Sequence, residues 1–239
     1  MFNIDLFRKR TNRKANNLTV AENGQQVILD SDIISWSEVL PKLRKVPEGV
    51  QKDDYSQTTV LGSQDGFMKA FNTATLKYHE MYDASGKWGT VVKGSKNLSS
   101  LTISPFRSDD KDPSFAQKVD VPSDSKVVFI GDIHSSFHSF IEIIEHLVSR
   151  SILGDDLVLD PKYFIIFIGD IFDRGPYALD ILNIIIRIKN KNFEKVIIGN
   201  GNHEDIGMYK KGGTGEEVSN QLISNKDEST FHTLVKFFP

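Results

Sequence analysis

Three short apolar runs, each followed directly by glycine and polar residues, constrain the fold of this chain more than any other feature. The runs cover Lys126–Ile130, Tyr163–Ile168 and Lys195–Ile198, and they are typical of buried strands. Between them, Phe137–Arg150 and Leu179–Lys189 carry apolar residues at helical spacing. This alternation predicts an α/β fold with a parallel βαβαβ sheet and flanking helices. Because the runs are nearly all apolar, we expect both faces of the sheet to be covered.

The residues that follow the runs form three polar strings, Gly131–His134, Gly169–Gly175 and Gly201–Glu204. The strings place possible metal ligands at the carboxyl ends of these strands, where open α/β sheets bind ligands. Asp132 and His134 follow the first strand, Asp170 follows the second, and Asn202 follows the third. Carboxylate, imidazole and amide groups suit divalent manganese, iron or zinc. We therefore predict that these four residues hold two divalent metal ions, with Asp170 bridging both.

Three further residues in these strings complete the chemistry of a phosphoester hydrolase. His203 is predicted to be a general acid that protonates the leaving group, and Asp173 is its natural carboxylate partner. Arg174 can grip two phosphate oxygens with its guanidinium fork. Each string alone would be an ordinary turn or a surface ion pair, but their occurrence in order after three strands favours a functional site.

Composition and charge exclude several other classes of protein. The formal net charge of −3 argues against a nucleic-acid binder that relies on backbone contacts. The absence of cysteine excludes disulfides and thiolate metal sites, and it fits a cytoplasmic location. No apolar stretch is long enough for a membrane span. Met1–Lys14 has a cluster of basic residues and is interpreted as a solvated terminus rather than a membrane-surface helix.

Residues 1–125 are predicted to be an N-terminal extension of uncertain role that precedes a catalytic region at 126–239. We expect helices within Ser35–Lys45 and Asp65–Ala84, a hairpin within Gly86–Leu101, and a surface connection over Asn97–Asp124. The side chains outside the strings are interpreted as packing or surface residues without a catalytic role: Trp36, Trp88, His79, His138 and His146.

The three strings together resemble the phosphoprotein phosphatase family of calcineurin-like metallophosphoesterases. The resemblance covers about Lys126 to Pro239, and Gly169–Gly175 is its most specific part. It implies a phosphatase acting on phosphoserine or phosphothreonine, with phosphotyrosine not excluded. It also implies that one metal is held by Asp132, His134 and Asp170, and the second partly by Asp170 and Asn202, with His203, Asp173 and Arg174 in the roles given above.

Four departures from the family pattern stand out. Ser135 occupies a position that is usually glycine, Asn200 one that is usually arginine, and an insertion lies around Arg150–Lys162. The fourth is that the family uses two further histidines for the second metal, whereas His232 is the only histidine after His203 and precedes the expected position. We therefore expect an incomplete second metal site, a sheet truncated before its usual second layer, and weak or absent activity of this chain alone.

Two alternative functions remain open at this stage. The first is a dinucleoside polyphosphate hydrolase, whose motifs are closely related. The second is a non-catalytic fragment in which the N-terminal region binds a regulatory or host protein. A secreted effector that acts in a host cytosol is also compatible with the sequence.

Overall fold

The structure is a computed structural model. It describes residues 35–44, 67, 69–74, 77, 88–91, 103–104, 115–117, 119–205, 208 and 211–221. The predictions made for Met1–Lys14, His79 and His232, and for the side chain of Trp88, lie outside the described residues.

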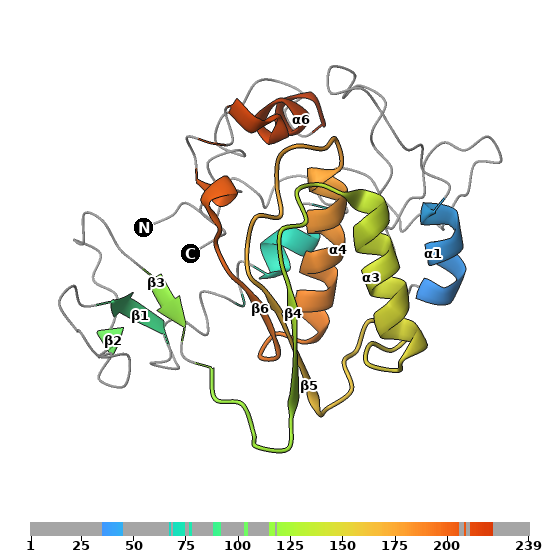
Figure 1. Ribbon diagram of the computed structural model, residues 1–239, viewed down its shortest axis with the longest axis vertical. Helices are drawn as coiled ribbons and strands as arrows, with labels where there is room; N and C mark the ends of the chain where they lie inside the picture. The colour runs from blue at the N-terminus through green and yellow to red at the C-terminus, as the bar shows by residue number, and fades with distance from the viewer. Residues whose placement is uncertain are drawn as a thin grey trace.

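A parallel sheet of three strands forms the centre of the molecule (Figure 1). Its strands are β4 (Lys126–Ile130), β5 (Tyr163–Phe167) and β6 (Val196–Ile198), in the order β4-β5-β6. Both neighbouring pairs are parallel. The predicted α/β fold with parallel pairing is therefore confirmed, and the strand limits differ from the prediction by one residue at most.

Two helices connect these strands and cover one face of the sheet. They are α3 (Phe137–Ser149) and α4 (Ala178–Lys191), close to the predicted limits. Because the strands follow one another in sequence order, two right-handed crossovers place both helices on the same face. The core beneath them contains apolar side chains from strands and helices alike, including Ile130, Ile165, Phe167, Val196, Ile198, Phe140, Ile144, Ile181 and Ile185.

The opposite face of the sheet is only partly covered. Phe129 is 66% exposed and Ile168 is 53% exposed, whereas Phe164 on β5 is buried. The expectation that both faces are covered is therefore wrong at Phe129 and Ile168. The physical reason is the strand order, since neither connecting helix can reach this face.

The predicted helix near residue 36 packs against the parallel sheet and its helices. Helix α1 (Trp36–Leu43) buries Trp36 in the same hydrophobic core, which confirms Trp36 as a packing residue. Its N-terminus is capped from the predicted insertion, because the backbone carbonyl of Asp155 accepts a bond from the Trp36 N–H at 3.0 Å and its carboxylate accepts one from the Ser37 N–H at 2.6 Å. The insertion thus fastens α1 to the sheet domain.

A second upstream segment joins the same core. Residues 67, 69–74 and 77 are helical, and Phe71 is fully buried among the core residues. Asn190 near the end of α4 donates its Nδ2–H to the Ala70 carbonyl at 2.9 Å, and Lys77 donates to the Asn190 carbonyl at 2.7 Å. The helix predicted over Asp65–Ala84 is confirmed at these positions, and its remainder lies outside the described residues.

A separate antiparallel sheet contains β1 (Trp88–Val91), β2 (Ile103–Ser104) and β3 (Phe115–Gln117), in the order β2-β1-β3. The predicted strand around Trp88 is present, but both of its partners lie beyond the predicted hairpin at Gly86–Leu101. They fall inside Asn97–Asp124, so the prediction of a plain surface connection is wrong there. Strands of two and three residues are too short to produce a hydrophobic period.

In the described part of the chain after β6 lie the 3₁₀ helix η4 (Asn202–Glu204) and the helix α6 (Thr214–Gln221). His138 and His146 lie on α3 as predicted. Across the described part of the chain, we find no helix with the length and apolar character needed to cross a membrane.

Candidate active site

The strand register brings the three polar strings to one edge of the sheet. The last residues of the three strands, Ile130, Phe167 and Ile198, are paired across the sheet and therefore end level with one another. Beyond them, the His134 N–H donates to the Asp170 carbonyl at 2.9 Å, and the next N–H donates to the Ile171 carbonyl at 2.8 Å. The first two strings are thus held side by side.

Three predicted ligands form a compact group. One ligand atom each from Asp132, His134 and Asp170 lies within 4.8 Å of the other two. The Nδ1 of His134 is 3.1 Å from the Phe172 carbonyl and can only donate to it, which leaves Nε2 with a lone pair for an ion. Two carboxylates and one oriented imidazole fit a divalent metal ion.

The fourth predicted ligand, Asn202, is placed beside this group by its neighbour in the chain. The N–H of His203 donates to Oδ1 of Asp170 at 3.0 Å, which ties the start of η4 to the ligand group. Asn202 itself is exposed at that point. The structure therefore brings the third string to the same place as the first two.

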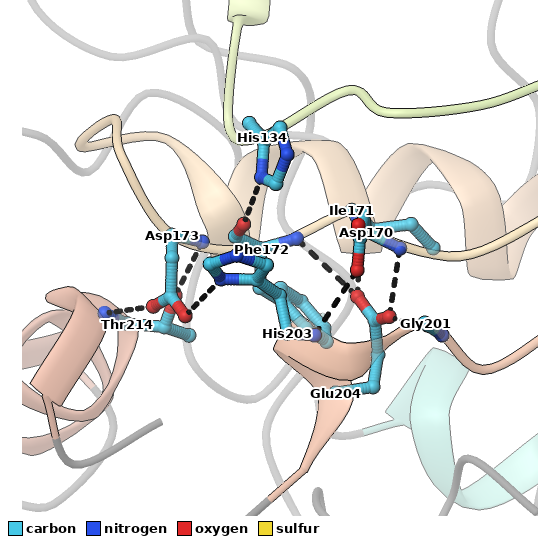
Figure 2. Close-up of polar contacts among 9 residues, drawn as sticks. All are labelled: His134, Asp170, Ile171, Phe172, Asp173, Gly201, His203, Glu204 and Thr214. Carbon is cyan, nitrogen blue, oxygen red and sulfur yellow. Dashed lines mark hydrogen bonds and ion pairs between the residues drawn. The ribbon is translucent and has the colours of Figure 1, made fainter. Parts of the chain in front are cut away.

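His203 and Asp173 form a buried pair, as predicted from their chemistry (Figure 2). Nδ1 of His203 lies 3.0 Å from Oδ2 of Asp173, and the two residues are 8% and 0% exposed. The rings of His203 and His134 meet edge to face with centroids 4.7 Å apart. The pair therefore lies directly against the metal-ligand group, with Nε2 of His203 left for a substrate.

Much of the backbone in these strings has a conformation that L-residues rarely adopt. Asp132, His134, Asp170, Asp173 and Arg174 all have φ between +44° and +67°. Such strain persists where surrounding structure over-determines it, and it clusters at active sites and ligand clamps. Arg174, the predicted phosphate ligand, is exposed beside the buried Asp173.

Two glycines allow the second and third strings to approach each other closely. Gly169 has φ +108°, and a Cβ there would collide with the backbone of Gly201. A Cβ on Gly201 would collide with the Asp170 carboxylate. A side chain at residue 169 would therefore push the third string away from the second, and one at residue 201 would displace Asp170.

Glu204 is a functional candidate that the sequence reasoning missed. Its buried carboxylate accepts backbone N–H bonds from Asp170 at 2.8 Å, Ile171 at 2.8 Å, Phe172 at 3.4 Å and Gly201 at 2.7 Å (Figure 2). It thus clamps the second string to the third. The one sequence signal for Glu204 is its position directly after Asn202 and His203. The sequence could not reveal its role, because the backbone N–H groups that it binds are brought together only by the fold.

A second buried carboxylate lies further from the ligand group. Glu217 on α6 accepts bonds from the N–H groups of Ala178 and Leu179 at the start of α4, both at 3.0 Å. Burial raises the pKa of Glu217 well above its ordinary value, and the nearby Asp180 raises it further. Burial also raises the pKa of Tyr177 to about 12.

Part of the chain is similar to known phosphoesterases. Residues 125–237 match the family model described as calcineurin-like phosphoesterase. The chain is 29% identical over 109 residues to the serine/threonine-protein phosphatase PP2A-like PPG1 of Candida albicans, covering 46% of this chain and 24% of that protein. It is 30% identical over 135 residues to the Shewanella-like protein phosphatase 1 of Plasmodium berghei, covering 54% and 36%. It is 32% identical over 103 residues to the serine/threonine-protein phosphatase PP1-1 of Saccharomyces cerevisiae, covering 43% and 30%.

The chain spans between about a quarter and a little over a third of the length of these relatives. Among solved structures it is similar to a protein serine/threonine phosphatase from Saccharomyces cerevisiae with similarity to human phosphatase PP5. That likeness has a TM-score of 0.44 at 16% identity and covers 72% of this chain and 42% of the other. The strand order and the matched family region, rather than this likeness, define the fold.

Proposed function

We propose that the protein is a metal-dependent phosphoprotein phosphatase, because residues 125–237 match the calcineurin-like phosphoesterase family model. The proposed substrates are phosphoserine and phosphothreonine in proteins, with phosphotyrosine as a further candidate. The names of the three relatives support a protein phosphatase. The observation that carries the proposal is the grouping of Asp132, His134 and Asp170 directly against the Asp173–His203 pair.

The family implies divalent metal ions, and the ligand group fits them. Asp132, His134 and Asp170 would hold one ion, and Asp170 with Asn202 would hold part of a second. Bound ions of this kind offset phosphate charge and activate a water molecule as the nucleophile. Carboxylate, imidazole and amide ligands suit manganese, iron or zinc at this position.

The chain's own side chains supply the remaining steps in this proposal. Asp173 accepts the Nδ1–H of His203 and supports the imidazolium form of the ring, whose Nε2–H is delivered to the departing serine or threonine oxygen. The exposed guanidinium of Arg174 binds phosphate oxygens and holds the ester in place. The protonated His203 ring and the Arg174 guanidinium both act on the substrate from the same edge of the sheet.

A comparison of substrates tests the proposal. The 239-residue chain is incubated with Mn²⁺ and either a phosphoserine peptide or diadenosine tetraphosphate, with Asp170→Asn and His203→Asn as variants. We expect weak, Mn²⁺-dependent phosphate release from the peptide that both variants abolish. Mn²⁺ binding, followed by calorimetry, is expected to fall in Asp170→Asn and to persist in His203→Asn. Cleavage confined to diadenosine tetraphosphate, or no turnover and no Mn²⁺ binding, would overturn the proposal.

A further inference from the structure

The start of α6 covers the carboxylate of Asp173 on the side away from His203. The N–H of Asp173 donates to Oγ1 of Thr214 at 3.0 Å, and the N–H of Thr214 donates back to Oδ1 of Asp173 at 3.2 Å (Figure 2). The other oxygen of Asp173, Oδ2, is the one that faces His203. Thr214 is 1% exposed and Asp173 is 0% exposed, so water does not compete for these bonds.

The turn before Thr214 is shaped to this carboxylate as well. A Cβ on Gly212 would collide with the carboxylate carbon and with both carboxylate oxygens of Asp173. Gly213, which follows, has φ +105°. The backbone of the turn therefore packs directly on the carboxylate, and a side chain at residue 212 would push it away from its present position.

The position of α6 is itself fixed by the body of the domain. Glu217, one turn after Thr214, reaches the N-terminus of α4 and accepts the N–H bonds of Ala178 and Leu179. An unbroken series of contacts thus runs from α4 through α6 to Asp173 and then to His203. Asp173 also has φ +66°, a strained backbone conformation that persists only where surrounding contacts hold it. The contacts from α6 are among those that fix the direction of its carboxylate.

We propose that Thr214 is a positioning residue for the phosphatase reaction. It holds the Asp173 carboxylate from behind through one side-chain bond and one backbone bond, and so fixes the direction in which His203 presents its proton. This inference rests on the proposed function, because it concerns the same proton donor. It adds α6, some 40 residues along the chain from Asp173, to the parts that the reaction needs.

Two substitutions at Thr214 separate positioning from simple packing. Thr214→Val keeps the shape of the side chain but removes the oxygen that accepts the Asp173 N–H, whereas Thr214→Ser keeps that oxygen. Gly212→Ala disturbs the same carboxylate by an independent route, and Glu216→Gln on the exposed side of α6 serves as the control.

The readouts are the downfield proton signal of the His203 Nδ1–H in NMR spectra and the dependence of hydrolysis on the leaving group. A misplaced general acid slows esters with poor leaving groups most, since good ones depart without protonation. We expect Thr214→Val and Gly212→Ala to lose the downfield signal and to hydrolyse phenyl phosphate on the order of tenfold more slowly, with little change for 4-nitrophenyl phosphate. Thr214→Ser and Glu216→Gln are expected to behave as the wild type in both assays, and Mn²⁺ affinity is expected to be unchanged throughout.

Retention of the downfield signal in folded Thr214→Val, or an equal loss of activity on both esters, would overturn the inference. Failure of the proposed function looks different, because the wild-type chain would then release no phosphate from either ester. In that case the NMR signal still decides whether Thr214 controls the Asp173–His203 pair.

Discussion

Replacing Ser135 with glycine is expected to stabilise the fold, although the residue directly follows the candidate metal ligand His134. Ser135 has φ +56° and is 1% exposed. Among the described residues, none gives its Oγ a hydrogen bond. The serine thus combines a left-handed backbone with a buried hydroxyl that has lost its hydration, and glycine relieves both.

The expected gain in stability is the sum of two favourable effects and one that opposes them. Removing Cβ from a left-handed residue is worth roughly 1–2 kcal/mol. Removing a buried hydroxyl without a partner is worth about 1–3 kcal/mol. The greater freedom of glycine in the unfolded chain takes back about 0.4–1 kcal/mol. A net gain of about 2 kcal/mol would raise the melting temperature of a chain of this size by ~4–8 °C.

Urea denaturation of matched variants separates these effects. Ser151→Gly is the control for backbone strain alone, since Ser151 has φ +55° but is exposed. Its expected gain is about 0.5 kcal/mol. Ser135→Ala removes the hydroxyl and keeps the Cβ, so its gain reports the buried oxygen. If Ser135→Gly is no more stable than Ser151→Gly, the hydroxyl is satisfied in solution and the reasoning is wrong.

Three further predictions test other parts of the fold. Glu204→Gln turns one accepting oxygen of the Glu204 carboxylate into a donor, and each bond lost to a charged acceptor costs about 1.5–3 kcal/mol. Calorimetry should therefore show weakened Mn²⁺ binding in this variant. Equal weakening in the matched Glu217→Gln variant would mean that general destabilisation is the cause. Burial lowers the pKa of Lys189 from 10.5 to about 7, so between these pH values the unfolded chain binds more protons at this lysine and the contribution of Lys189 to stability rises with pH. Lys189→Met should reduce the increase of stability with pH by about 1 kcal/mol per pH unit. Urea midpoints of the wild type and of Lys189→Met that change equally from pH 7 to pH 9 would contradict this. Asp155→Ala removes the cap of α1 and should cost about 1 kcal/mol at pH 7. The Ser37 N–H lowers the pKa of Asp155, so this cost should begin to shrink below the ordinary value near 3.8 and should be lost as pH falls through the lowered pKa; a cost that persists in stronger acid would point to packing instead.

The central strands and helices could be predicted because their residues carry the pattern locally. Val127–Ile130 is a continuous apolar run, and Phe137–Ser149 repeats its apolar residues at helical spacing. The meeting of the polar strings at one edge then followed from parallel pairing alone. The exposed face of the sheet did not follow, because it depends on which side the crossovers pass rather than on the composition of a strand.

The supporting parts of the site could not be predicted because their partners are far apart in the chain. Thr214 has no local feature that connects it with Asp173, and Glu204 meets the Asp170 loop only after β5 and β6 have paired. The cap that Asp155 places on α1 joins segments separated by more than a hundred residues. The left-handed φ of Asp132 is likewise imposed by its surroundings, since aspartate has no general preference strong enough to predict it.

The shared packing of Trp36 and Phe71 with the sheet domain has a practical consequence for anyone who prepares a shorter version of this protein. Cutting at residue 125, where the matched family region begins, would keep every candidate metal ligand. It would also remove the two helical segments that carry Trp36 and Phe71 from the hydrophobic core. The surfaces of α3 and of the end of α4 that these segments cover would then be exposed to solvent. Loss of turnover in such a shortened polypeptide would then report collapse of the scaffold and would not test the chemistry of the proposed metal centre.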